Sequence, residues 1–251
     1  MQRSALMIII RLCIISSLLM VSTTPAAAKT VVIKLATLAP EGSSWMETFN
    51  AIDAEIQQKT GGQVSCKLYA GGVLGDEKDM LRKMHIGQIH AAALTSAGLS
   101  AIFNEMDVFQ IPFLFESHAE IDFVLTQMDI FFRQGFDQNN YVLLGWSEAG
   151  FVRLMSTKPV ATLADLRKVK VWTWEDAPMT HVIFEEARVS AIPLSVPDVL
   201  VGLQTGLVDV VYAPPSRAIS LQWFTKTRYI TDVKLIYLIG GVVIKKKVFN
   251  K

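Results

Sequence analysis

The chain has 251 residues and nearly balanced charge, with 24 lysines and arginines against 23 aspartates and glutamates. This balance provides no basic field for a nucleic acid backbone, so we expect no nucleic-acid partner. The length suffices for one large domain or two small ones with substantial cores. Of the two cysteines, Cys13 lies in an apolar N-terminal run. Loss of that run would leave Cys66 alone, unable to form a disulfide within the chain.

The N-terminus has the layout of a secretory signal peptide. Arg3 and Arg11 accompany an apolar start, residues 12–21 are almost wholly apolar, and small residues lead up to Ala28. We predict cleavage after Ala28 and export to the periplasm, with no direct membrane insertion after cleavage. A permanent membrane anchor is the alternative, but the run interrupted by Arg11 is short for a bilayer span of about 20 residues.

The first half of the exported chain alternates strand and helix patterns. Expected strands cover residues 31–37, 63–69, 89–95, 141–146 and 150–155. Expected helices cover residues 45–59, 77–86 and 119–136. Ser43 and Ser44 stand where the first helix needs a cap, and Gly61 and Gly62 would end it. Cys66 falls in the inward row of its strand, so we expect it to be a small core residue.

The second half repeats this alternation. Expected strands cover residues 170–174, 208–212 and 237–243. Expected helices cover residues 162–166, a capped turn, and 178–187, 198–204 and 217–224. Alternating strands and helices predict an α/β fold with parallel sheets covered on both faces. A glycine-linked break between Trp146 and Gly150 is our candidate for the first crossing between lobes.

Five stretches then occur in an order that resembles one family across the whole exported chain. They are residues 34–40, 69–77, 111–115, 162–166 with the following Lys170-Val171, and 203–209, which reads Leu-Gln-Thr-Gly-Leu-Val-Asp. Together they resemble the DctP family of solute receptors from tripartite (TRAP-type) transporters. The resemblance implies a two-lobed, periplasmic-binding-protein-like α/β fold with hinge-crossing strands and a ligand cleft between the lobes. It also implies delivery of a small-molecule ligand to TRAP permease membrane subunits, with no enzymatic activity and no cofactor.

The resemblance also suggests how the chain divides. Residues 1–28 are the signal peptide, 29–148 form the main part of the first lobe and 149–235 the main part of the second. Residues 236–251 supply a crossing strand that returns to the first lobe. Family members usually continue well past this point with helices that complete both lobes. We therefore expect a C-terminally truncated chain with some apolar surface uncovered.

The arginines with which many family members bind an anionic ligand are replaced in this sequence. Many members hold small organic acids with an arginine at the position that matches Trp172 here, and an indole cannot form a bidentate carboxylate contact. A second family arginine matches Val152. Arg153 lies one step along, where a strand residue points to the opposite face. A C4-dicarboxylate or sialic-acid type of ligand is therefore disfavoured.

Aromatic and apolar residues stand where the clamp would be. Trp172 and Trp174 project on one strand face, Tyr212 lies near a strand end, and Leu38 ends the first strand. Such a cleft would favour an apolar or aromatic ligand. The alternative is that both tryptophans pack under a neighbouring helix. Our ligand-binding candidates are Leu38, Thr95, Arg153, Trp172, Trp174, Glu175, Tyr212 and Pro214.

One rival interpretation is an exported α/β hydrolase that uses Ser147. Residues 145–149 match the nucleophile-elbow motif around this serine except at the last position, where Ala149 replaces the glycine of the motif. The elbow also needs a helix after the turn, and residues 151–155 look like a strand. We therefore rank the hydrolase below the receptor.

Other charged positions give weaker signals. His85 and His90 are five residues apart and so do not share a helix face as paired metal ligands do, and we expect no metal site. Arg217, Lys226 and Arg228 form a loose basic region that is more typical of solvated surface than of an anion site.

Overall fold

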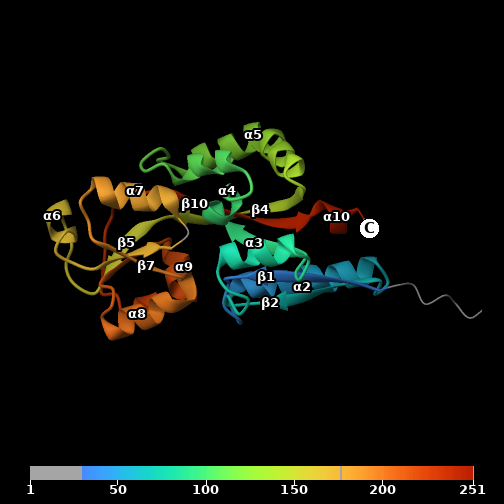
Figure 1. Ribbon diagram of the computed structural model, residues 1–251, viewed down its shortest axis with the longest axis horizontal. Coiled ribbons are helices and arrows are strands. Elements are labelled where there is room, and N and C mark those ends of the chain that lie inside the picture. The colour runs from blue at the N-terminus through green and yellow to red at the C-terminus, as the bar shows by residue number, and fades with distance from the viewer. Residues whose placement is uncertain (1–29, 176, 251) are drawn as a thin grey trace, which may run out of the picture.

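The computed structural model describes residues 30–175 and 177–250, which form two lobes, each built on a five-stranded sheet (Figure 1). The predicted signal peptide lies outside the described residues. In the first lobe the strand order is β2-β1-β3-β10-β4. These strands are β1 (Val31–Thr37), β2 (Val64–Tyr69), β3 (Ala91–Thr95), β4 (Tyr141–Phe151) and β10 (Tyr237–Lys245).

Helices cover both faces of the first sheet. They are α2 (Ser44–Lys59), α3 (Glu77–His85), α4 (Ser96–Ser100), α5 (His118–Gln138) and α10 (Lys246–Phe249), with a 3₁₀ segment, η1 (Asn104–Gln110). As the sequence predicts, the Ser43 hydroxyl caps α2 by accepting a hydrogen bond from the Met46 amide at 3.4 Å. Gly61 and Gly62 follow the helix with φ of 58° and 76°, which is the left-handed region that glycine adopts readily.

The second lobe has the strand order β7-β6-β8-β5-β9. Its strands are β5 (Arg153–Ser156), β6 (Val171–Trp174), β7 (Ala191–Leu194), β8 (Val210–Ala213) and β9 (Tyr229–Ile230). Its helices are α6 (Leu163–Leu166), α7 (Pro178–Glu186), α8 (Val199–Thr205) and α9 (Pro215–Ser220), with 3₁₀ segments η2 (Val196–Asp198) and η3 (Trp223–Thr225). The single helix expected over 217–224 is therefore two pieces, separated at Gln222, whose φ of 60° breaks the helical run.

The α/β prediction is confirmed, but the expectation of parallel sheets is only partly correct. β2, β1 and β3 are parallel, as are β7, β6 and β8. β10 runs antiparallel to both of its neighbours, and β5 runs antiparallel to β8 and β9. The antiparallel strands are those next to the connections between the lobes, because a chain that leaves one sheet and later returns must reverse its direction.

Two chain segments cross between the lobes. The first passes through Val152, between β4 and β5, slightly beyond the glycine-linked break that we expected to be the crossing. The second covers residues 231–236, between β9 and β10. The Val152 amide donates to the Ile236 carbonyl at 2.9 Å, and the Val152 carbonyl accepts from the Leu235 amide at 3.0 Å. The two crossings therefore form one hydrogen-bonded ribbon.

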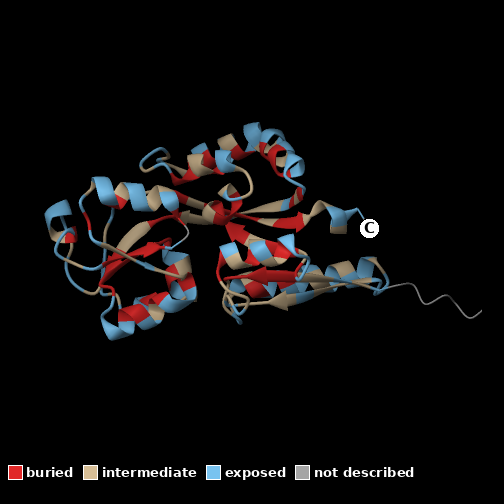
Figure 2. Cartoon of the chain, in the orientation of Figure 1, coloured by how far each residue is buried: buried red, intermediate tan, exposed pale blue. Residues whose placement is uncertain are grey.

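The first sheet separates two apolar cores. Leu35 faces α2 and packs with Met46 and Phe49, whereas its neighbour Ala36 faces the opposite side, in the cluster that contains Met80 of α3. This alternation follows from the two-residue period of a strand. The cluster that contains Ala36 and Met80 continues into the second lobe. Buried positions therefore extend across the junction between the two lobes in Figure 2.

Cys66 was expected to be a core residue, but it is only half-buried and belongs to no core cluster, because β2 lies at the edge of its sheet. Burial is the main cause that raises the pKa of its thiol, to about 11. Thiolates are the reactive form of cysteine, so this thiol is poorly suited to nucleophilic or redox chemistry at neutral pH.

The capped turn at α6 provides a test of local stability. The Thr162 hydroxyl accepts from the Asp165 amide at 3.2 Å, and the Asp165 carboxylate accepts from the Thr162 amide at 3.1 Å, which completes a capping box. We expect Thr162→Ala to lower the free energy of unfolding by about 1 kcal/mol, measured by urea denaturation. Thr162→Ser keeps the hydroxyl and should retain most of that stability. Equal losses in both variants would contradict the capping explanation.

Candidate functional site

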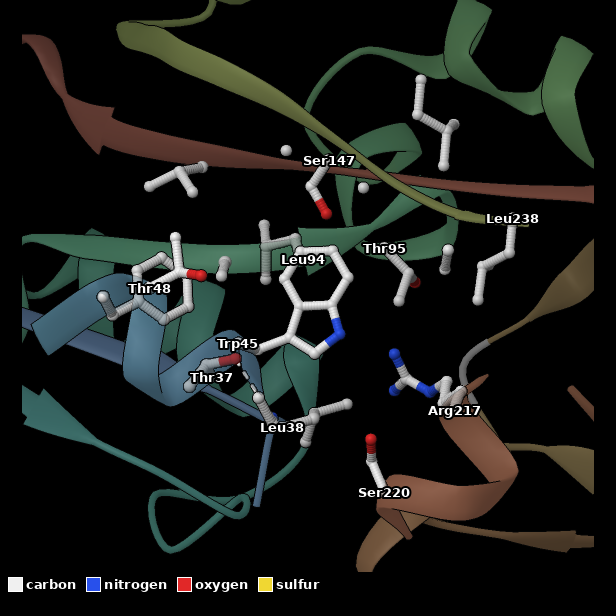
Figure 3. Close-up of a pocket in the computed structure, with 18 of the residues that line it drawn as sticks. Thr37, Leu38, Trp45, Thr48, Leu94, Thr95, Ser147, Arg217, Ser220 and Leu238 are labelled. Atoms are coloured by element: carbon white, nitrogen blue, oxygen red, sulfur yellow. Dashed lines mark hydrogen bonds between the residues drawn. The ribbon is translucent and has the colours of Figure 1, made fainter. Parts of the chain in front are cut away.

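A cavity of about 190 Å³ lies between the two lobes (Figure 3). One buried water needs roughly 10–15 Å³ on this measure, so the cavity has room for a small organic molecule. The first lobe contributes Leu38 and Trp45, and the second contributes Arg217 and Ser220 from α9. A molecule in this cavity would therefore contact both lobes at once.

The fold explains why the first-lobe residues gather here. Leu38 directly follows β1 and Thr95 ends β3, and the carboxyl ends of these parallel strands lie at one edge of the sheet. Ligands of open α/β sheets bind outside that edge. Trp45, Phe49 and Ile52 are spaced by four and three residues, so they form one face of α2, and all three line the cavity.

The cavity lining is mostly apolar. Its larger apolar side chains are Leu38, Trp45, Phe49, Ile52, Leu94, Trp146, Leu221, Leu238, Ile239 and Val242. Polar side chains are fewer and include Thr37, Thr48, Glu77, Thr95, Ser147, Ser216, Arg217 and Ser220. At the floor, β10 approaches β3 closely at Gly240, where a Cβ would lie 2.8 Å from the Leu94 carbonyl oxygen. Glycine at this position therefore allows the two backbones to meet beneath the cavity.

Arg217 contradicts the expectation of a solvated basic region. Its Nη2 is buried and has no hydrogen-bond partner. Burial is the main cause that lowers the pKa of this guanidinium, and the nearby carboxylates of Glu77 and Asp76 oppose the shift. In Figure 3 the guanidinium extends from α9 toward the indole of Trp45. Folding has thus removed this donor from water without supplying an acceptor.

Glu77 begins α3 and is a buried residue of the first lobe that lines the larger cavity. Its carboxyl oxygens lie 2.8 Å from the Thr95 amide and 3.0 Å from the Thr95 hydroxyl. Desolvation by burial is the largest cause that raises the pKa of Glu77, to about 7. Arg217 opposes this shift, so the two residues interact electrostatically.

Asp76 links the two lobes directly. Its Oδ2 accepts hydrogen bonds from the Trp174 indole and from the Val196 amide, both at 2.9 Å and both from the second lobe. Its Oδ1 accepts from the Glu77 amide at 2.7 Å and so caps α3 in the first lobe. One buried carboxylate therefore joins a helix of one lobe to the sheet of the other.

The predicted aromatic residues form a cluster inside the second lobe. The Trp172 ring stacks on Tyr212 with centroids 4.6 Å apart and meets Trp223 edge-on at 5.3 Å. The Trp172 indole donates to the Leu194 carbonyl at 3.0 Å. Trp172, Trp174 and Tyr212 line a smaller cavity of about 40 Å³, which Arg217 and Leu238 separate from the larger one. The aromatic residues are thus brought together, but next to the main cavity rather than in it.

Of the five remaining ligand-binding candidates, two line the larger cavity and three line neither cavity. Leu38 and Thr95 line the larger cavity. Arg153 lines neither cavity, because its Nη1 pairs with Asp232 at 2.6 Å and donates to the Thr231 carbonyl. Glu175 is exposed and Pro214 is buried at the start of α9, and neither lines a cavity.

The sequence interpretation missed three residues that the structure brings to the cavity. Trp45 and Glu77 each begin a helix just after a strand or turn of the first lobe, and Arg217 lies in the first turn of α9 after β8. The available signal for all three was a position in the first turn of a helix that follows a strand.

Ser147 does line the larger cavity, but it does not sit on a nucleophile elbow. It lies within β4 and pairs with Gly240 of β10, whereas the elbow is a sharp turn from strand to helix. Among the described residues that line the cavity there is no histidine to activate a serine. The geometry therefore contradicts the hydrolase interpretation of Ser147.

Two features are absent from residues 30–175 and 177–250. No helix there has the length and apolar character needed to cross a membrane. No group of three histidines, cysteines or acidic residues in the same ranges is arranged to hold a metal ion.

The sequence model of a family described as bacterial extracellular solute-binding protein, family 7 (DctP), matches residues 35–251. A solute-binding protein of Chromohalobacter salexigens is 27% identical over 157 residues, covering 62% of this chain and 46% of the relative. The 2,3-diketo-L-gulonate-binding periplasmic protein of Escherichia coli is 27% identical over 200 residues, covering 78% of this chain and 60% of the relative. This chain thus spans about half the length of the relatives it matches.

Solved structures give the same fold. A TRAP periplasmic solute binding protein from Pseudomonas putida, with bound D-glucuronate, superposes with a TM-score of 0.81 at 24% identity, covering 88% of this chain and 73% of that one. One from Sulfurospirillum deleyianum, with bound succinate, has a TM-score of 0.81 at 19% identity, covering 89% and 72%. At these identities the likeness establishes the two-lobed fold.

The Asp76 link predicts a stability cost for an isosteric change. Asp76→Asn replaces one accepting carboxylate oxygen with an NH₂ group, which would face the N–H donors that now bind the carboxylate. At least one of these buried donors therefore loses its acceptor. We expect the free energy of unfolding to fall by about 1–3 kcal/mol, measured by urea denaturation. Asp79→Asn on the same helix is the matched control, because Asp79 is 43% exposed and pairs only with exposed Arg82. A loss in Asp79→Asn as large as that in Asp76→Asn would contradict the link.

Glu77 predicts a pH dependence of stability. Its carboxyl binds a proton more tightly in the folded chain, with a pKa of about 7, than at its ordinary value of 4.5. Its contribution is therefore complete below about pH 4.5 and is lost as the pH rises through 7, by at most about 1.4 kcal/mol per pH unit. We expect Glu77→Gln to flatten the unfolding free energy between pH 4.5 and 7, whereas exposed Glu47→Gln should not. An unchanged slope in Glu77→Gln would refute this assignment.

Proposed function

We propose that this chain, which belongs to the bacterial extracellular solute-binding protein family 7, is the periplasmic receptor of a TRAP-type transporter. It captures a small organic ligand between its lobes and delivers it to the membrane permease. The observation that carries this proposal is the cavity of about 190 Å³, which is lined from both lobes. The family match over residues 35–251 supports it.

The arrangement of the lobes suits capture by closure. A ligand that contacts Leu38 and Trp45 on one side and Ser220 on the other lowers the free energy of the closed form relative to the open one. The crossing ribbon at Val152 and Ile236 keeps the lobes connected during this motion. We propose that the moving bodies follow the predicted division into residues 29–148 and 149–235, with residues 236–251 returning to the first. The first boundary moves to Val152, because residues 149–151 belong to β4 of the first sheet.

The lining favours a ligand more apolar or aromatic than a C4-dicarboxylate. Trp45, Leu38 and Leu238 offer apolar area, and each Å² of apolar surface removed from water contributes about 25 cal/mol. The Trp45 indole also offers a face on which a ring could stack. The related structures hold acids, glucuronate and succinate among them, so an acidic group on the ligand is compatible with this view.

The partner in this proposal is the pair of TRAP permease subunits. A receptor that closes over its ligand presents a different surface in each state, and a permease that prefers the closed surface would accept the loaded receptor. The proposed role is ligand delivery without chemical change, so the receptor needs no catalytic group or cofactor.

The purified protein would be screened by thermal unfolding and tryptophan fluorescence against aromatic, branched aliphatic and dicarboxylic compounds. A ligand at 100 times its Kd should stabilise the native state by about 2.7 kcal/mol. We expect aromatic compounds to raise the midpoint most and to change the fluorescence of Trp45.

Trp45→Ala should weaken aromatic ligands by roughly tenfold or more, because the ring loses its stacking surface. Phe123→Ala is the matched control, since this ring is 66% exposed on α5 and lines neither cavity. Tight binding of succinate that does not change in Trp45→Ala would disprove the apolar-ligand proposal while leaving the receptor function standing.

A further inference from the structure

We propose that two short segments, residues 72–76 of the first lobe and 196–197 of the second, form a latch that holds the cleft closed and so sets how tightly any ligand is retained. This inference rests on the proposed receptor function. It concerns the closure of the lobes, whereas the cavity lining concerns which ligand fits. Every group of the latch belongs to the chain, so the latch can form without a contribution from the ligand.

The first component of the latch is a pair of hydrogen bonds to one carboxylate. Oδ2 of Asp76 accepts from the Trp174 indole and from the Val196 amide, each at 2.9 Å. Asp76 is 7% exposed and Val196 is 3% exposed, so water competes little for these bonds. Hydrogen bonds to a charged acceptor are about twice as strong as neutral ones. Separating the lobes would break both of them.

The second component is a close contact at a glycine. Gly72 has a φ of 71°, and a Cβ at this position would lie 2.8 Å from Cγ of Pro197 in the second lobe. Cβ atoms essentially never approach another heavy atom so closely, and the ring of a proline cannot rotate away. The absence of a side chain at Gly72 therefore allows the turn after β2 to pack directly against η2.

The latch lies far from the crossing segments. Residues 72–76 follow β2 and residues 196–197 follow β7, and these two strands are outer edges of their sheets. The crossings connect β4 with β5 and β9 with β10, at or next to the opposite edges. When two bodies rotate about a hinge, the points farthest from it move most. The latch contacts should therefore break at small opening angles and distinguish the closed form from a slightly open one.

The latch is also bonded to the wall of the larger cavity. The Gly72 amide donates to the Thr37 carbonyl at 3.0 Å, and the Gly71 amide donates to the Ala39 carbonyl at 2.8 Å. Thr37, Leu38 and Ala39 all line that cavity. A ligand that draws the second lobe against this wall therefore also brings the two halves of the latch together.

The latch predicts a change in affinity that does not depend on ligand chemistry. The apparent Kd of a ligand that needs the closed form is its intrinsic Kd divided by the closed fraction. A variant that opens the latch lowers this fraction for every ligand alike. Different ligands should therefore weaken by one common factor, whereas loss of a cavity contact would weaken them according to their chemistry.

The test compares Gly72→Ala with Gly71→Ala. Both add a methyl group at a left-handed glycine, but the Cβ position of Gly71 has open space around it, whereas that of Gly72 meets Pro197. We expect small-angle X-ray scattering to give a larger ligand-free radius of gyration for Gly72→Ala than for wild type or Gly71→Ala. Calorimetry should show phenylacetate and D-glucuronate weakened by the same factor, roughly tenfold, in Gly72→Ala alone.

Two further variants separate the latch from misfolding and from an altered cavity. Pro197→Ala removes the Cγ that the new methyl group meets, so Gly72→Ala combined with Pro197→Ala should regain the wild-type radius and affinities. Trp174→Phe keeps an aromatic ring but loses the indole donor to Asp76, so it should raise the radius and weaken both ligands alike. If Gly72→Ala does not fold, Trp174→Phe decides by the same two measurements.

The outcomes for the latch and for the receptor function are distinct. Equal radii and equal affinities in Gly72→Ala and Gly71→Ala would overturn the latch and leave the receptor function standing. A loss in Gly72→Ala that Pro197→Ala does not reverse would also overturn it. If the radii differ as expected but no compound of the wider screen stabilises the protein, the latch stands and the receptor function fails.

Discussion

The buried carboxylate of Asp76 is the interaction on which the arrangement of the two lobes depends. It caps α3 in the first lobe and accepts two hydrogen bonds from β6 and from the segment after β7 in the second. A carboxylate without these three donors would be strongly disfavoured in a buried position. Because the donors come from both lobes, these hydrogen bonds hold the lobes at one distance in this structure. That distance in turn determines the space left for the ligand.

The charge of the site follows from the same geometry. Asp76 and Glu77 accept hydrogen bonds from other donors, and the buried Nη2 of Arg217 has no hydrogen-bond partner. Trp172, at the position where the resemblance led us to expect an arginine, stacks its ring on Tyr212 within the second lobe. Arg217, a cation in the cavity lining, lies on a helix rather than on a strand.

Much of the fold could be predicted from the sequence, because strands and helices here follow simple periodicity and capping rules. Ser43, Thr162 and the two-residue alternation of β1 are examples. The strand directions were not predictable in the same way, because whether β10 returns parallel or antiparallel depends on where the chain crosses. The site was predicted only in part. Leu38 and Thr95 line the cavity, but Arg153 is held by Asp232, since a one-residue step in a strand reverses a side chain.

The paired crossings have a mechanical meaning. Val152 exchanges two backbone hydrogen bonds with residues 235 and 236, so the link between the lobes is a short antiparallel ladder instead of two independent tethers. A ladder resists stretching and in-plane shear, because either would break those bonds, but it twists easily. The lobes should therefore move relative to each other mainly by rotation about the axis of this ladder. Such a path would carry α9 toward or away from α2 without changing the length of the connection.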